Sequence, residues 1–381
     1  MTPAADDLVL AVNSGSSSLK FGLFTEQNGE ETVILRGSAD GIGKPDGRLR
    51  VENSAGKVLL DEGYSLDTQS KALEESFRAL LKFARSAPVA VGHRVVHGGP
   101  HLREHQRITD KLIRTLEAAV HFAPLHIPAA LELIRETERL LPDAQQFACF
   151  DTAFHTTMPE SSFVYALPRE IRDKGVQRYG FHGLSYESIV RRLGEKIPVR
   201  TVCAHLGSGA SLAALRDGRS VDTSMGLTPT GGVPMATRVG DLDPGVLLFL
   251  MRTEGMDADA LETILNRKSG FAALAEGETD MRQLLTRMEQ GDHDAALAVE
   301  IFASAVRKFI GAYAAEFGGL DLLVFTGGIG EHSAEVRGRI CRGLDFLGIR
   351  PAAPGQFSNV MVMTSEEEVQ IARHCRRLLR T

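Results

Sequence analysis

The segment LVLAVNSGSSSLKFGLF, residues 8–24, constrains the fold most, because a tight loop of Asn, Gly and four Ser separates two apolar runs. Apolar residues alternate on both sides of this loop: Leu8, Leu10 and Val12 before it, then Leu19, Phe21 and Leu23 after it. This period of two predicts a β-hairpin. The loop offers backbone N–H groups and hydroxyls to a phosphate, and Lys20 adds a positive charge. The P-loop spacing is absent, and a serine-rich turn without a ligand is the alternative interpretation.

Length and charge limit the classes to which the chain can belong. With 381 residues it is longer than one hydrophobic core usually becomes, so we expect two domains. The net charge of −6 provides no basic field, and neither nucleic acid nor a membrane is an expected partner. The four cysteines contain no CxxC pair, which argues against zinc. Because Cys149 and Cys203 lie in apolar runs and MTPAADDLVLAV has no basic leader, we expect a cytoplasmic protein with reduced core thiols.

Apolar periodicity predicts strands that alternate with helices, which is typical of an α/β protein. Residues 7–65 are predicted to be rich in β-strands. Helices are expected over residues 67–86, 109–121, 127–140, 244–253, 257–265 and 290–317, and the tail MVMTSEEEVQIARHCRRLL should form a strand and then a helix. Residues 200–225 repeat the strand, small-residue loop and strand of residues 8–24. This repetition suggests an internal duplication.

Two further glycine-rich segments are candidates for binding a polyphosphate. Residues 205–209 (HLGSG) lie between two expected strands. Residues 327–331 (GGIGE) follow an apolar strand and open a helix, whose N-terminus favours an anion. An ordinary turn is the alternative for each segment. A dinucleotide-binding fold needs GxGxxG in its first strand–helix turn, so a nucleotide kinase is favoured over a nicotinamide enzyme.

Charged residues in glycine-rich loops complete the set of candidates. Arg94 (VGHRVVHGG) and Arg238 (PMATRVGDLDP) have the planar guanidinium that binds carboxylates and phosphoryl groups, although a surface salt bridge is the commoner role. Asp151 ends the strand QQFACF, where a carboxylate beside a polyphosphate would imply Mg²⁺. His126 and His182 are candidate hydrogen-bond donors. The run of three Glu at 366–368, like Asp280 with Arg282, is also consistent with a plain helix start.

Taken together, these segments resemble the acetate kinase family. The motifs NSGSSSLK, VGHRVVHGG, APLH, FDTAFH, YGFHG, HLGSGAS, TRVGDLDP, DMR, FTGGIGEH and EEEVQIAR occur in family order over residues 8–373. The resemblance implies a duplicated ribonuclease H-like (actin-like, sugar kinase) fold with an active-site cleft between two domains, in a homodimer. The first domain would comprise residues 1–152 with about 369–381, and the second about 153–368.

The resemblance also implies the roles of individual residues. Asn13, Asp151 and Glu367 would organise Mg²⁺, with Mn²⁺ as the alternative metal. The catalytic residues would be Asp151, Arg94, Arg238, His182 and His126. Arg94 with Val96, Leu125, Phe181 and Pro229 would bind the short-chain acid. ATP or ADP would contact Ser16, Ser18, Lys20, His205, Leu206, Gly207, Ser208, Gly209, Asp280, Met281, Arg282, Gly328, Ile329, Gly330, Glu331 and His332.

Several positions depart from the family pattern. Ile127 and Ser208 stand where Asn is usual, Tyr186 replaces a His, Glu366 replaces an Asn, and the segment before Arg238 is TPTGGVPMAT. The resemblance implies transfer of phosphate from ATP to acetate, giving ADP and acetyl phosphate, and the departures bear on acyl chain length and rate. A propionate or butyrate kinase, a low-activity paralogue and an actin-like ATPase with a protein partner are the alternatives.

Overall fold

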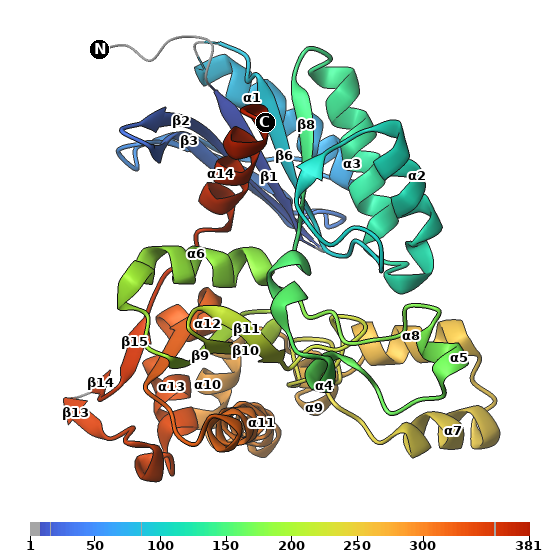
Figure 1. The fold of residues 1–381 in the computed structure, drawn as a ribbon, viewed down its shortest axis with the longest axis vertical. Coiled ribbons are helices and arrows are strands. Elements are labelled where there is room, and N and C mark those ends of the chain that lie inside the picture. Colours follow the sequence, from blue (N-terminus) through green and yellow to red (C-terminus); the bar gives the residue numbers. More distant parts are fainter. Residues whose placement is uncertain (1–7, 16, 85, 354–355) are drawn as a thin grey trace. The chain divides into compact units, whose positions relative to one another are not determined.

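The computed structural model describes residues 8–15, 17–84, 86–353 and 356–381 (Figure 1). The chain divides into two compact units. The first consists of Met1–Ala153, Gly183–Ser188 and Glu366–Thr381, and the second of Phe154–His182 and Ile189–Ser365. Each unit contains a mixed sheet with helices packed on it, so the predicted α/β class is confirmed.

The first unit contains an eight-stranded sheet in the order β5-β4-β3-β2-β1-β6-β8-β7. The predicted hairpin is present, with Val12 opposite Phe21. Strand β6 runs parallel to β1, and β8 runs parallel to β6. The strands are β1 (Val9–Ser14), β2 (Ser18–Gln27), β3 (Glu30–Asp40), β4 (Arg48–Asn53), β5 (Val58–Gly63), β6 (Ala90–Val95), β7 (Gln106–Arg107) and β8 (Gln145–Phe150).

Alternation along these strands produces two apolar faces. Leu10 and Val12 of β1 pack in one core cluster with residues of α1 (Gln69–Phe83) and α3 (Ile127–Leu140). Val9 and Ala11 pack in the other cluster with α14 (Glu367–Leu379), which runs along that face in Figure 1. A Cβ at Gly92 of β6 would come within 2.4 Å of Ile371 and Cys375. Glycine at this position therefore allows α14 to pack closely against β6.

The second unit contains a five-stranded sheet in the order β11-β10-β9-β12-β15. Its strand directions match those of β3-β2-β1-β6-β8: two antiparallel pairs are followed by two parallel pairs. The duplication that the sequence suggested is thus a repetition of sheet topology. The strands are β9 (Arg200–Leu206), β10 (Ala210–Arg216), β11 (Arg219–Thr223), β12 (Leu322–Thr326) and β15 (Val360–Val362), with β13 (Pro351–Ala353) and β14 (Gln356–Phe357) in a separate pair.

Most expected helices form close to their predicted bounds. Residues 127–140 and 244–253 coincide with α3 and α7 (Pro244–Thr253). The helix expected over residues 290–317 begins three residues later than predicted, because Asp292 is the N-cap of α11 (His293–Phe317). The remaining helices are α2 (Asp110–Ala118), α4 (Glu160–Phe163), α5 (Arg169–Arg172), α6 (Gly183–Leu193), α8 (Ala258–Arg267), α9 (Gly270–Leu274), α10 (Met281–Glu289), α12 (Gly327–His332) and α13 (Ala334–Cys341), with short 3₁₀ turns such as Val120–Phe122.

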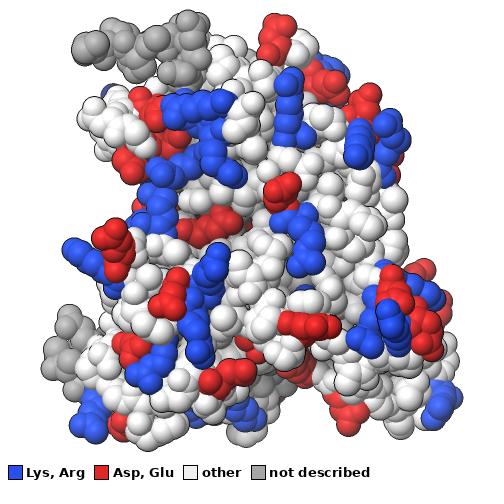
Figure 2. Space-filling view, viewed as in Figure 1, with Lys and Arg blue, Asp and Glu red and all other residues white. Residues whose placement is uncertain are grey.

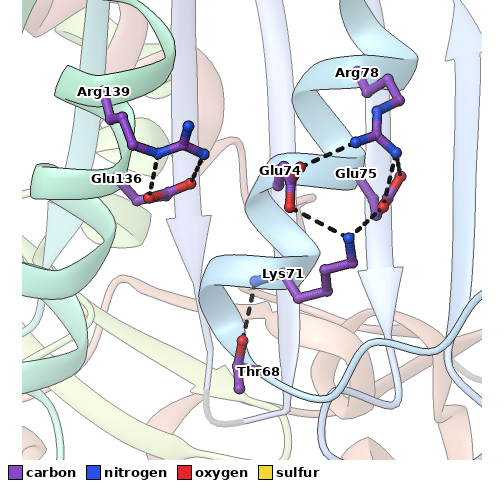
Figure 3. Close-up of polar contacts among 7 residues, drawn as sticks. All are labelled: Thr68, Lys71, Glu74, Glu75, Arg78, Glu136 and Arg139. Atoms are coloured by element: carbon purple, nitrogen blue, oxygen red, sulfur yellow. Dashed lines mark hydrogen bonds and ion pairs between the residues drawn. The ribbon is translucent and has the colours of Figure 1, made fainter.

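The surface carries charges of both signs, and the cysteines lie in the core. Acidic and basic side chains lie side by side over the face shown in Figure 2. On α1, Thr68 accepts the capping hydrogen bond from Lys71 N, and Lys71 and Arg78 pair with Glu74 and Glu75 (Figure 3). The four cysteines are buried and free, and burial raises the pKa of Cys203 to about 12. Within the described ranges, no helix combines the length and apolarity that crossing a membrane requires.

Candidate active site

In the first unit, three polar residues lie at the ends of neighbouring strands, and the alternation of side chains along each strand places them on one face of the sheet. Val12 lies beside His93, and Arg94 lies beside Cys149. Asn13 of β1, Arg94 of β6 and Asp151 after β8 therefore share the sheet face that α14 covers. The apolar residues of the same strands, such as Ala11 and Cys149, form the packed part of this face.

Asn13, Arg94 and Asp151 are directly hydrogen bonded. Arg94 donates to Asp151 Oδ2 from Nε at 2.8 Å and from Nη2 at 2.6 Å, and to Asn13 Oδ1 from Nη1 at 3.1 Å. The Asp151 side chain is fully buried, and that of Arg94 is 15% exposed. A charged pair in such surroundings is costly to form and costly to break, so its geometry is tightly held.

The start of α14 brings two more carboxylates to this cluster. Asn13 Nδ2 donates to Glu367 Oε2 at 2.9 Å and to Glu368 Oε1 at 2.8 Å. Acidic residues in a first turn are favoured by the helix dipole, as the sequence indicated, but here they also contact the strand ends. Glu368 was not among the predicted site residues, because the run of three Glu does not reveal which side chains turn inward.

Electrostatics distinguish this cluster from an ordinary ion pair. Burial raises the pKa of Asp151 to about 6, and the Arg94 charge offsets burial only in part. Burial acts to lower the pKa of Arg94, but the nearby Asp151 and Glu367 charges outweigh it and raise that pKa. In the described part of the chain, Asp151 Oδ1 is buried without a hydrogen-bond partner. Three carboxylates with one guanidinium and an unpaired oxygen form a donor set that suits Mg²⁺.

The hairpin loop beside this cluster is held by one backbone hydrogen bond and one hydrogen bond from a side chain. Gly15 N donates to Ser18 O at 2.8 Å, and Gln69 Nε2 donates to Gly15 O at 2.9 Å. Lys20 lies directly opposite Asn13 in the hairpin register, so both side chains are on one sheet face, and Lys20 is exposed. Ser16, which the sequence predicted as a phosphate contact, lies outside the described residues.

In the second unit, the two predicted glycine loops are adjacent. Thr326 at the end of β12 lies beside His205 of β9. A Cβ on Gly327, whose φ is +76°, would come within 2.8 Å of Leu206 O, and one on Gly207 would lie 3.9 Å from Gly328 N. The parallel pairing of β9 with β12 thus brings together residues 205–209 and α12, which are far apart in the sequence.

His182 lies against the same loop. Its backbone φ of 58° is left-handed, which is costly for a residue other than glycine and is often found at functional sites. Nδ1 is 2.8 Å from Ser211 Oγ, and the ring stacks on His205 with centroids 4.3 Å apart. When Ser211 donates to Nδ1, Nε2 carries the proton and is a hydrogen-bond donor.

Arg238 approaches the loop from the segment after β11. The position of a Gly209 Cβ would be 3.4 Å from His182 Nε2 and 3.5 Å from Arg238 Nη1. Arg238 Nη1 donates to Pro229 O at 3.1 Å, and Ala236 N donates to Ser208 O at 3.3 Å. Five predicted residues, His182, Ser208, Gly209, Pro229 and Arg238, are therefore neighbours in this unit.

For the other predicted residues, the structure gives local contacts or burial. Asp280 caps α10 and pairs with Arg282, whose side chain is 88% exposed, while Met281 is buried. Glu331 accepts hydrogen bonds from Gly327 N and Ser365 N, both at 3.0 Å. His126 is the N-cap of α3. Among the remaining predicted residues, Phe181 is buried, Val96 is half-buried, and Leu125 and His332 are exposed.

Comparisons with known proteins identify the family of this chain. A family model described as the acetokinase family matches residues 8–373. The acetate kinase of Bacillus subtilis is 38% identical over 97% of this chain and 99% of its own, and that of Geobacillus kaustophilus is 40% identical over 97% and 98%.

Solved structures show the same fold over the whole chain. Acetate kinase from Porphyromonas gingivalis has a TM-score of 0.83 at 35% identity, and propionate kinase from Francisella tularensis has a TM-score of 0.88 at 33% identity. Each comparison covers 98% of this chain and 100% of the solved chain. These matches confirm the predicted fold class and show that the chain belongs to the acetokinase family.

Proposed function

We propose that this protein transfers the γ-phosphoryl group of ATP to acetate, reversibly, giving ADP and acetyl phosphate. The observation that carries the proposal is the cluster of Asn13, Arg94, Asp151 and Glu367, which combines a guanidinium with a buried carboxylate oxygen that has no hydrogen-bond partner. Family membership and the acetate kinases among the relatives support the same reaction.

The donor set supports a magnesium site. Asp151 Oδ1, Glu367 and the amide oxygen of Asn13 would hold the ion, and Glu368 is close enough to Asn13 to take part. When bound, Mg²⁺ or Mn²⁺ would neutralise charge on the phosphate oxygens. The chain's own part is to supply oxygen ligands and to exclude competing hydrogen bonds from Asp151 Oδ1.

Arg94 is suited to bind the acid. The hydrogen bonds to Asp151 and Asn13 use three of the five guanidinium N–H groups. The other N–H donors can meet the acetate carboxylate as a charge-assisted pair. Val96, Leu125, Phe181 and Pro229 remain the proposed surroundings of the methyl group.

The transfer requires no general base, because acetate is already anionic at neutral pH. A carboxylate oxygen forms a bond to the γ-phosphorus, and the bond from that phosphorus to the β–γ bridging oxygen breaks, so that ADP leaves with the electron pair. Arg238 and the Nε2–H of His182 would donate to the equatorial phosphoryl oxygens. The residues of 205–209 and Gly327–His332 would bind the nucleotide.

A longer acid is the second candidate substrate, because propionate kinase from Francisella tularensis is similar over the whole chain. One methylene in an apolar pocket changes discrimination by only ~1–3 kcal/mol. We therefore propose acetate as the preferred acid and propionate as a slower substrate.

We also propose that the enzyme is a cytoplasmic homodimer. Helix α7 has no buried residue, and it exposes Val246, Leu248, Phe249 and Met251. An exposed apolar face of this kind marks an interaction surface. The free, buried cysteines fit a reducing compartment.

A hydroxamate assay with ATP, Mg²⁺ and a panel of C1–C5 acids tests the proposal. We expect acyl phosphate and ADP in equal amounts, with the highest kcat/KM for acetate and a lower value for propionate. ATP turnover that does not respond to any acid would support the actin-like ATPase instead.

A further inference from the structure

Three side chains of the first unit meet next to the Asn13–Asp151 cluster although no role was predicted for them. Glu187 on α6 lies between His105, which precedes β7, and His374 on α14. Glu187 Oε1 is 3.2 Å from His105 Nε2, and Oε2 is 2.5 Å from His374 Nε2. The two imidazole rings are in contact, with centroids 3.9 Å apart. All three side chains are at most 16% exposed.

The protons of this group can be assigned from its contacts. Phe150 N donates to His105 Nδ1 at 3.0 Å, so Nδ1 presents a lone pair and Nε2 carries the proton. His105 therefore donates to Glu187, and Gln370 Nε2 donates to Glu187 Oε2 at 3.2 Å. His374 Nε2 lies within hydrogen-bond distance of both Glu187 Oε2, at 2.5 Å, and Gln370 Nε2, at 3.1 Å. Burial alone would raise the pKa of Glu187, but the hydrogen bonds from His105 and His374 outweigh it and hold that pKa well below its usual range.

The same assignment argues against a metal ion at this place. The candidate ligand atoms of His105, Glu187 and His374 lie within 4.8 Å of one another, a spacing that a transition metal could use. A metal on His105 Nε2 would need the lone pair there, and the proton would then move to Nδ1, where it would face the N–H of Phe150. The geometry therefore favours a carboxylate that accepts hydrogen bonds from His105 and Gln370 and contacts His374.

Each partner of Glu187 is tied to a residue of the proposed active site. Phe150 immediately precedes Asp151, and Gly183 N, one helical turn before Glu187, donates to Asp151 O at 2.9 Å. Gln370 and His374 follow Glu367 by three and seven residues, so they lie on one face of α14. Glu187 thus connects the end of β8 to the helix that supplies Glu367.

We propose that Glu187 is a positioning residue: it fixes the rotation of α14 about its axis, so that Glu367 is held at the correct distance from Asp151. This inference rests on the proposed function only in its catalytic readout. Outer partners of metal-binding residues typically contribute about 10–100-fold in metal affinity or activity. The effect of losing Glu187 should therefore be on the requirement for Mg²⁺.

Glu187→Gln tests the proposal, because it keeps the size of the side chain but removes the charge and replaces one acceptor with a donor. We expect the Mg²⁺ concentration for half-maximal activity to rise about tenfold, kcat to fall, and the KM for ATP to change less than twofold. Mn²⁺ binding, followed by electron paramagnetic resonance without substrates, should weaken by a similar factor. The matched control is Glu136→Gln on α3, which loses only an exposed pair with Arg139 (Figure 3) and should behave as wild type.

Two variants of His374 separate positioning from general stability. His374→Gln retains an N–H donor near the Nε2 position, whereas His374→Leu removes it, so the leucine variant should shift the Mg²⁺ requirement more. A lowered melting temperature in Glu187→Gln and His374→Leu with unchanged Mn²⁺ binding would overturn the proposal. So would one equivalent of Zn²⁺ that stays bound to wild type through dialysis and is lost in His374→Gln. Wild type without acyl phosphate formation would instead overturn the proposed function, and the Mn²⁺ measurement would still test Glu187.

Discussion

The two β-hairpins occupy the same place in two sheets of the same topology but present different chemistry. In the first unit, Asn13 faces Lys20 across the hairpin, and Arg94 lies at the same level on the next parallel strand. In the second unit, His205 faces Ser211, and Thr326 occupies the level that corresponds to Arg94. The first set is charged, whereas the second is neutral or weakly basic.

The difference follows from what each unit is proposed to bind. A carboxylate and a divalent cation need charged partners at short distance, and the first unit provides Arg94 with Asp151, Glu367 and Glu368. A nucleotide needs backbone N–H groups and room for a close approach, and the second unit provides glycine loops. One scaffold can thus support both tasks, because alternation exposes the strand-end residues of each sheet in the same way.

Breaking the charged set should have the largest effect. Arg94→Met leaves Asp151 and Glu367 without their cation, so we expect a loss of stability of about 3–5 kcal/mol and a fall in kcat/KM for acetate on the order of 10³. Urea unfolding and acetyl phosphate formation measure the two effects. The double variant with Asp151→Asn should regain stability but no activity. If the double variant were no more stable than Arg94→Met, the buried ion pair would not be the source of the loss.

Removing the arginine of the second unit should affect the reaction more than the fold. Arg238 Nη1 donates to the backbone oxygen of Pro229, a neutral acceptor, at 3.1 Å. Arg238→Ala should lower kcat about 10²-fold and change the KM for ATP only a few-fold, with a smaller loss of stability than Arg94→Met. An unchanged kcat would remove Arg238 from the proposed mechanism.

The pH dependence of stability tests the first unit separately from its charged cluster. His93 is next to Arg94 in β6, so its side chain lies on the opposite face of the sheet. Burial lowers the pKa of His93 to about 4, although Gln146 opposes the shift. As the pH falls, His93 is therefore protonated in the unfolded chain before it is protonated in the folded protein. The contribution of neutral His93 to the free energy of unfolding is complete above about pH 6.5 and is lost as the pH falls toward 4. The loss should approach roughly 3 kcal/mol. Urea unfolding between pH 7 and 4.5 measures it, and His93→Gln should flatten the profile; an equally steep profile would assign the loss to other groups.

The smallest effect concerns the left-handed residue of the second unit. His182→Gly relieves the strain of φ 58°, whereas His182→Ala keeps that strain and likewise loses the hydrogen bond to Ser211. We expect the glycine variant to be about 1 kcal/mol more stable than the alanine variant, with equally low activity in both. Equal unfolding free energies would mean that the backbone conformation relaxes without cost.

The sequence indicated which residues gather in the first-unit cluster better than it indicated the contacts around them. Arg94, Asp151 and Glu367 were identified by residue type and motif, and the structure brings them together with Asn13. The sequence did not indicate that Glu368 turns toward Asn13, or that Glu187 meets His105 and His374, because hydrogen bonds between side chains more than 80 residues apart leave no local periodicity. The role of Asp280 as an N-cap was one of two open interpretations, and the structure contains that cap.

By itself, the sequence determined the α/β class and most of the longer helices and strands, and it suggested the duplication, since apolar alternation, helical periodicity and glycine loops are local properties. It also determined the acetokinase family, because ten motifs occur in order along residues 8–373. Only the tertiary structure decided which strand ends are neighbours and which carboxylates of α14 turn toward Asn13. These depend on strand pairing and on the rotation of one helix, and both are set by packing between distant segments rather than by neighbouring residues.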